Sequence, residues 1–97
     1  MQNDGAAEVT LEKTFTVDNE LGLHLRAAGK FAQTAGRFSS NIWVKKDNVE
    51  VNAKSIMGIL SLAAARGSCV AVRCSGTDAE RAMDAISALF EKKFHEE

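Results

Sequence analysis

The 97-residue sequence has no proline and no tyrosine, and it lacks an excess of either charge. Twelve basic residues against thirteen acidic ones leave a formal charge of -1, which gives no general attraction to nucleic acid or to an anionic membrane. No apolar run approaches the roughly 20 residues of a membrane-spanning helix, and the polar start M-Q-N-D-G is unlike a signal peptide. We therefore expect a cytoplasmic protein that binds neither nucleic acid nor membrane.

The two cysteines, Cys69 and Cys74, are spaced for neither a disulfide nor a metal site. An odd spacing along a strand directs side chains to opposite faces. There is no C-x-x-C motif and no histidine close to either cysteine. We predict two free thiols in a reducing compartment, with no metal and no cofactor.

The length and the composition, 45% hydrophobic and 26% charged residues, suit one soluble globular domain with a modest core. Residues 1–8 are small and polar, which favours a flexible N-terminal tail. We expect a single domain over residues 9–97 and a monomeric protein.

Alternating apolar and polar residues predict four strands, and apolar residues at helical spacing predict three helices. The strands are expected over 11–17, 42–45, 49–51 and 69–75, with the middle pair forming a hairpin. The helices are expected over 25–35, over 55–65 between a cap at Ser55 and a stop at Gly67, and from a capping box at Thr77 to Phe90. This β-α-β-β-α-β-α order predicts an α+β fold, in which three helices cover one face of a four-stranded sheet and solvent covers the other.

His24 stands at the predicted start of the first helix, in L-G-L-H-L-R-A-A. If it is the N-cap, the backbone amides of Leu25, Arg26 and Ala27 lack partners within the helix and form an anion site. The Arg26 guanidinium matches phosphate oxygens, and Gly22 permits a tight turn. A histidine there could accept a phosphoryl group on one ring nitrogen. On these residues alone, a solvated loop histidine beside a surface arginine remains the commoner explanation.

A second segment, V-N-A-K-S-I-M-G-I-L-S-L, predicts a short helix that is apolar on nearly every side. Core packing should claim Ile59 and Leu62, so the other apolar side chains should face solvent as a partner-docking surface. Those docking candidates are Ile56, Met57 and Leu60. Ser55 is suited to cap the helix, and a phosphoryl group on Ser55 would repel an acidic partner.

Taken together, G-L-H-L-R-A-A at 22–28, K-S-I-M-G-I-L-S-L at 54–62 and the order of elements resemble the HPr family over about residues 9–92. HPr proteins are the histidine-containing phosphocarriers of the bacterial phosphoenolpyruvate-dependent sugar phosphotransferase system. The resemblance implies an open-faced β-sandwich with an antiparallel sheet, and a phosphocarrier rather than an enzyme.

The resemblance also implies roles for individual residues. His24 would take a phosphoryl group on Nδ1 from phosphorylated enzyme I and pass it to a histidine of an enzyme IIA domain. Arg26 would balance the phosphate charge, and Ser55 would match the serine that HPr kinase/phosphorylase modifies. Ile56, Met57 and Leu60 would belong to the docking surface.

Two residues depart from the family's usual pattern. Leu25 stands where a small residue is usual, and as a larger apolar side chain it would extend the docking surface. Ala27 stands where proline is usual, so the first helical turn is less rigid but has one more N–H group near the phosphate. We hypothesise that the Ala27 amide joins the anion site.

Two other functions are alternatives to the phosphocarrier. An HPr paralogue could serve mainly in control, through a nitrogen-type phosphorelay or as the partner of a transcription regulator, although His24 argues against a form without the reactive group. An unrelated ferredoxin-type sandwich could bind a small ligand or RNA. The balanced charge and the single tryptophan, Trp43, disfavour RNA.

Overall fold

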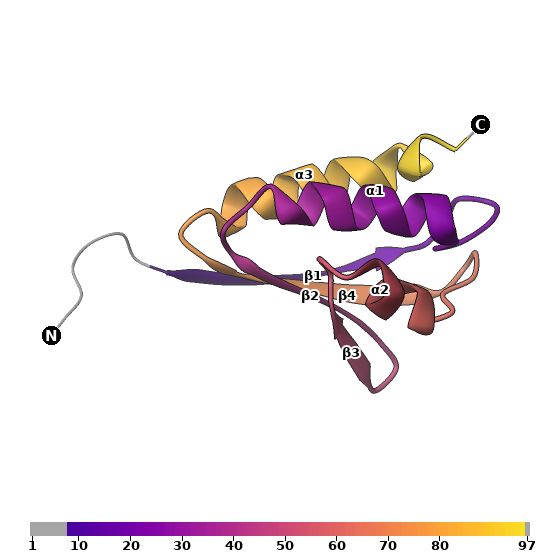
Figure 1. Ribbon diagram of the computed structural model, residues 1–97, viewed down its shortest axis with the longest axis horizontal. Helices are drawn as coiled ribbons and strands as arrows, with labels where there is room; N and C mark the ends of the chain where they lie inside the picture. Colours follow the sequence, from indigo (N-terminus) through magenta and orange to yellow (C-terminus); the bar gives the residue numbers. More distant parts are fainter. Residues whose placement is uncertain (1–7, 97) are drawn as a thin grey trace, which may run out of the picture.

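The computed structural model describes residues 8–96, and their elements follow the predicted β-α-β-β-α-β-α order (Figure 1). The predicted tail over residues 1–8 lies outside the described residues except for Glu8. The elements are β1 (Val9–Thr16), α1 (Leu25–Gly36), β2 (Asn41–Lys46), β3 (Val49–Asn52), α2 (Ile56–Ser61), β4 (Cys69–Gly76), α3 (Ala79–Glu91) and a final turn, η1 (Lys93–His95).

The four strands form one antiparallel sheet in the order β1-β4-β2-β3. Helices α1 and α3 lie side by side over one face of this sheet, and α2 packs against α1 and β3 near one end (Figure 1). No described helix covers the opposite face. The predicted open-faced α+β sandwich is therefore confirmed.

The core lies between the sheet and the two long helices. Strand alternation sends one set of side chains inward, and helical spacing does the same for α1 and α3. Its largest members are fully buried and include Phe31, Ile42, Val44, Val70, Val72 and Ile86. Each of these side chains contributes about 1.5–3 kcal/mol by leaving water, so their burial holds the helices over the sheet.

The two cysteines lie on opposite faces of β4, as predicted. Cys69 is exposed, Cys74 is buried in the core, and both are free thiols. Burial, with a smaller effect from the nearby Asp78 carboxylate, raises the pKa of the Cys74 thiol to about 11. Cys74 is therefore held as a neutral, unreactive apolar group.

Helix α2 is shorter than predicted, because it ends at Ser61 and not at Ala65. Ser55 is its N-cap, as expected, and the Ser55 hydroxyl oxygen accepts a hydrogen bond from the Gly58 amide at 3.0 Å. The chain leaves the helix at Ala63, whose φ is +51°. The Ala64 carbonyl is then free to accept a hydrogen bond from the Leu23 amide at 2.9 Å. A contact across the fold therefore replaces the last helical turn.

The predicted capping box at the start of α3 is also wrong. The N-cap is Asp78 rather than Thr77, and no side chain caps the helix. The Asp78 carboxylate instead accepts hydrogen bonds from the backbone amides of Ser39 and Ser40, both at 2.9 Å, and from the Ser40 hydroxyl. Asp78 thus fastens the loop between α1 and β2 to the start of α3.

Candidate functional site

His24 is the N-cap of α1, as the sequence predicted. Its backbone is extended, with φ -80° and ψ -176°, and its carbonyl accepts the first helical hydrogen bond, from the Ala28 amide at 2.8 Å. The His24 Nδ1 atom accepts a hydrogen bond from the Arg26 amide at 3.3 Å. The Nδ1 lone pair is thereby directed at the first turn, where amides without helical partners carry the positive end of the helix dipole.

Gly22 fixes the path of the chain into His24. Its φ is +68°, and a Cβ atom at this position would lie 2.5 Å from the Ala64 carbonyl oxygen and 2.9 Å from the Ala65 Cα. Only glycine accepts both this conformation and this approach. The neighbouring Leu23 is buried and bonded to Ala64. The histidine therefore sits on a loop clamped against the segment that follows α2.

A carboxylate from the C-terminal end of the chain lies on the other side of the His24 ring. Glu96 Oε1 is 3.9 Å from His24 Nε2, which is too long for a hydrogen bond but close enough for an electrostatic interaction. The Glu96 carboxylate accepts hydrogen bonds from the side-chain amide of Asn19 at 2.7 Å and from the backbone amide of Leu21 at 3.2 Å. The Asn19 amide also donates to the Gly22 carbonyl at 2.6 Å. A buried asparagine thus joins the histidine loop to Glu96.

Glu96 reaches this position because the chain reverses at η1. All three residues of this turn have positive φ values, between 52° and 59°, which cost of order 1–3 kcal/mol each. Phe94 offsets that cost by burial, because its ring packs against those of Phe31 and Phe90, with centroids 6.1 and 4.9 Å away. The aromatic cluster therefore places Glu96 beside the histidine.

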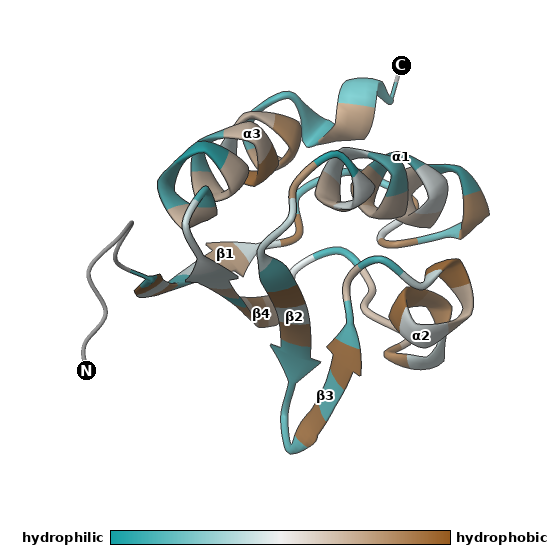
Figure 2. Cartoon of the chain, turned by 60° about the vertical axis from the view of Figure 1, so that its left-hand side comes forward, coloured by the Kyte–Doolittle hydropathy of each residue, from teal (hydrophilic) through white to brown (hydrophobic). Residues whose placement is uncertain are grey.

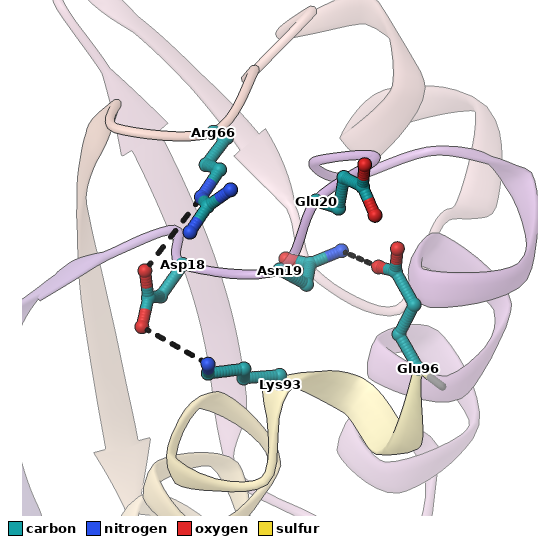
Figure 3. A pocket seen from close by; sticks show the side chains of 6 residues that line it. All are labelled: Asp18, Asn19, Glu20, Arg66, Lys93 and Glu96. Carbon is teal, nitrogen blue, oxygen red and sulfur yellow. Dashed lines mark hydrogen bonds and ion pairs between the residues drawn. The ribbon is translucent and has the colours of Figure 1, made fainter.

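Ion pairs at the protein surface lie next to Asn19 and Glu96 (Figure 3). The Asp18 carboxylate contacts Arg66 at 3.9 Å and Lys93 at 3.7 Å around a hollow of about 220 Å³, and Asn19 and Glu96 also line this hollow. All three charged groups are more than half exposed, so each pair contributes about 1 kcal/mol at most. They link Asp18, in the loop before α1, to Arg66 in the loop before β4 and to Lys93 in η1.

Sequence reasoning did not find Asn19 or Glu96. They are 77 positions apart and belong to no local motif, so periodicity and spacing contain no signal for their contact. Asn19 stands between two charged residues, Asp18 and Glu20, so no local sign in the sequence indicates that its side chain is buried.

Arg26 and Leu25 are both exposed beside the histidine. Leu25 is 66% exposed. Among the described residues no carboxylate lies within ion-pair distance of Arg26. The Arg26 guanidinium is therefore available to a ligand at the helix start.

The predicted docking candidates on α2 divide between surface and core. Met57 is 75% and Ile56 40% exposed, whereas Leu60 is half-buried against the core. Ile59 and Leu62 are buried, as predicted. The apolar segments of α2 and of the loop leading into α1 lie at the same end of the molecule (Figure 2).

The comparisons with known proteins identify the family. The family model described as "PTS HPr component phosphorylation site" matches residues 11–92. The chain belongs to the HPr family. It is 49% identical to phosphocarrier protein HPr of Xylella fastidiosa over 90% of this chain and 98% of that one. It also superimposes on HPr of Thermoanaerobacter tengcongensis with a TM-score of 0.86 and 52% identity, over 90% of this chain and 98% of that one.

This family member is therefore a phosphocarrier of the phosphotransferase system and not an enzyme. Family members with other names are also similar to it. HPr-like protein Crh of Halalkalibacterium halodurans is 45% identical over 86% of this chain and 99% of that one. Phosphocarrier protein NPr of Shewanella violacea is 40% identical over 89% of this chain and 94% of that one.

Residues 8–96 contain neither a cluster of metal ligands nor a membrane-spanning helix. Within this range no three His, Cys, Asp or Glu side chains are grouped as metal ligands. No helix in the same range is both long enough and apolar enough to span a bilayer.

Proposed function

We propose that this HPr accepts a phosphoryl group from phosphorylated enzyme I on Nδ1 of His24. It passes the group to a histidine of an enzyme IIA domain during sugar uptake, in the cytoplasm and as a monomer. The observation that carries the proposal is the hydrogen bond from the Arg26 amide to His24 Nδ1. Because Nδ1 accepts this bond, it holds a lone pair and no proton, and that lone pair is the nucleophile.

The transfer exchanges one P–N bond for another. The Nδ1 lone pair attacks the phosphorus of the donor phosphohistidine, the donor P–N bond breaks, and its electron pair returns to the donor imidazole. The phosphoryl oxygens then take the place of Nδ1 as acceptors for the amides of Leu25, Arg26 and Ala27, and the Arg26 guanidinium adds a counter-charge. Positioning and electrostatics supply the assistance that such a transfer needs.

Glu96 complements this chemistry at the opposite nitrogen. A carboxylate 3.9 Å from Nε2 favours the tautomer that carries its proton there. That tautomer leaves Nδ1 free to react, and the proton stays on Nε2 after phosphorylation. In this proposal Glu96 is a positioning residue that touches neither phosphate nor partner.

The apolar residues near His24 form the proposed docking surface: Leu25, Ile56, Met57 and Leu60. Leu25, Ile56 and Met57 are exposed large apolar side chains, which is unusual for a surface with no partner. Leu21, at 64% exposed, extends the same end of the molecule and was not predicted. Leu21 and His24 also line a shallow hollow of about 200 Å³ beside the segment after α2, which in this proposal receives a partner side chain.

The proposal is tested with enzyme I and phosphoenolpyruvate, followed by mass spectrometry. Wild-type protein should gain one phosphoryl group that is labile in acid and stable in alkali. His24→Ala should gain none, while the control His95→Ala should behave as wild type. An unmodified wild-type protein, or an adduct that survives His24→Ala, would overturn the assignment.

Control through Ser55 is the second part of the proposal. Ser55 caps α2 beside the exposed Ile56 and Met57, so phosphorylation of Ser55 by HPr kinase/phosphorylase would set two negative charges next to the docking surface. We expect Ser55→Asp to slow transfer from enzyme I about tenfold or more. Ser61→Asp, a matched change at the exposed end of the same helix, should leave the rate within about twofold. Equal effects of both changes would contradict a specific role for Ser55.

The alternative is a mainly regulatory branch of the family, acting in a nitrogen-type phosphorelay or on a transcription regulator. This alternative is supported by the similarity of the chain to family members with other names, at 40% identity to an NPr and 45% identity to a Crh. Measured transfer rates to a sugar-type and a nitrogen-type IIA domain separate the two. Faster transfer to the sugar-type domain favours the main proposal, and faster transfer to the nitrogen-type domain favours the alternative.

A further inference from the structure

A second concave site lies away from His24, in the groove between α1 and α3. It has a volume of about 330 Å³. Its polar rim contains the basic side chains of Lys30, Arg37, Lys92 and His95, and Ala88 and Leu89 contribute apolar surface between them. None of the residues that line it is acidic. This volume is at the lower end of the range for small-molecule pockets.

The basic residues of this groove are not neutralised by the protein. None of the four forms an ion pair with a described carboxylate. Lys30 donates one hydrogen bond to the Phe94 carbonyl at 3.0 Å, which holds its ammonium group in place. A protein with a formal charge of -1 thus gathers three cationic side chains and one histidine around one hollow. Their mutual repulsion falls when an anion enters.

The arrangement of the charges indicates the shape of that anion. Lys30 and Arg37 are about 10 Å apart along α1, since the helix rises 1.5 Å per residue. Lys92 and His95 approach from the end of α3 and the turn after it. Lys30, Arg37 and Lys92 are three permanent cations, more charge than a single phosphate dianion balances, whereas two or three linked phosphates match it.

We propose that the α1–α3 groove is a binding site for a short phosphate chain, either free or carried by a nucleotide. The groove shares no lining residue with the His24 site, which lies at the start of α1. The proposed ligand site is therefore distinct from the phosphoryl acceptor.

The test uses ¹H–¹⁵N NMR titration of the full chain in a His24→Ala background, which removes the phosphoryl acceptor. Sodium tripolyphosphate should produce saturable shifts in amides of Thr34, Arg37, Ala88 and Lys92, with inorganic phosphate at least tenfold weaker. ATP provides the second arm. Tighter binding of ATP than of tripolyphosphate assigns the base to the apolar surface of the groove, and equal binding assigns the phosphate chain alone.

A pair of matched variants decides whether the groove is responsible. Arg37→Ala with Lys92→Ala should weaken tripolyphosphate binding at least tenfold. The control pair on β2, Lys45→Ala with Lys46→Ala, removes the same charge. It should change the affinity for tripolyphosphate less than threefold. Equal weakening by both pairs, shifts confined to residues 24–28, or no saturable shifts would overturn the proposal. His24 phosphorylation by enzyme I, measured in the groove variant with His24 intact, should be unchanged, which separates failure here from failure of the carrier function.

Discussion

At the scale of single residues, the two nitrogens of His24 face different surroundings. Nδ1 accepts from the Arg26 amide at the positive end of α1, whereas Nε2 faces the Glu96 carboxylate. The helix side supplies donors for a phosphate, and the carboxylate side supplies an acceptor for the ring proton. In the proposed function this difference makes Nδ1 the nucleophilic atom of His24.

A substitution at Ala27 tests whether its backbone amide belongs to the anion site at the start of α1. It occupies the third position of α1, where proline is sterically tolerated but supplies no N–H. We expect Ala27→Pro to shorten the lifetime of phosphorylated His24 about tenfold, because a hydrogen bond to a charged group contributes about 1.5–3 kcal/mol. The lifetime is followed by loss of the adduct in mass spectrometry. An unchanged or longer lifetime, with thermal unfolding unchanged, would refute a role for this amide.

A substitution at Glu96 tests whether its carboxylate sets the tautomer of His24. Glu96→Gln keeps the size of the side chain but removes the charge next to Nε2. We expect a several-fold slower phosphorylation of His24 and a larger share of the tautomer protonated on Nδ1, observed in ¹⁵N spectra of the imidazole. Glu91→Gln, an exposed change on α3, is the control. A slower rate with an unaltered tautomer ratio would contradict the positioning role.

At the scale of elements, the start of α1 depends on the segment after α2. The Leu23–Ala64 hydrogen bond and the close approach at Gly22 join two loops that are distant in the chain. Helix α2 ends early, at Ser61, so that Ala64 can take part. Helix α2 and His24 are thus held in a fixed relation.

Gly22→Ala should break that relation. The added Cβ would meet the Ala64 carbonyl oxygen at 2.5 Å, and the φ of +68° is unfavourable for alanine. We expect a loss of about 2 kcal/mol or more in the free energy of unfolding, measured with urea. Gly29→Ala, inside α1 where a Cβ meets nothing within 4 Å, should be stabilising by about 0.5–1 kcal/mol. Equal changes in the free energy of unfolding at both positions would contradict a special role for the close contact between Gly22 and Ala64.

At the scale of the whole molecule, Asp78 joins the two halves of the chain. It lies 39 positions from Ser39, and its carboxylate accepts from both Ser39 and Ser40. The hydroxyl of Ser40, followed by the backbone amide of Ser39, lowers the pKa of Asp78 from 3.8 to about 2. The folded state therefore binds a proton at Asp78 less readily than the unfolded chain does.

This difference predicts an acid dependence of stability. A lowered pKa stabilises the fold above pH 3.8, and the contribution is lost as the pH falls through about 2. Asp78→Asn should lower the free energy of unfolding near pH 6, and the gap from wild type should narrow between pH 4 and pH 2. Urea unfolding of both proteins at each pH measures this difference in the free energy of unfolding. A gap that stays constant over this range would exclude the carboxylate charge as its cause.

Much of the fold and part of the site could be predicted from local patterns. The alternation in β4 and the helical spacing in α1 and α3 each depend on which face of one element is buried, and this is visible within a few residues. The N-cap position of His24 followed in the same way from its place before the first helical turn. The roles of His24, Arg26 and Ser55 stay predictions that the experiments above address.

The two wrongly predicted helix ends have one cause. Thr77 and Ala65 were assigned by local rules for helix ends, but Asp78 and Ala64 form hydrogen bonds with distant segments instead. A helix end leaves several backbone groups without partners, so any strong partner brought by the fold can redefine where the helix stops.

The sequence by itself determined the order of the elements, the buried faces and the histidine at the start of a helix, because these follow from short-range periodicity and backbone preference. Only the tertiary structure decided that Glu96 and Asn19 stand behind His24 and that four basic residues surround one groove. Such contacts depend on where the aromatic core places the end of the chain, and a contact between segments 77 positions apart leaves no local pattern.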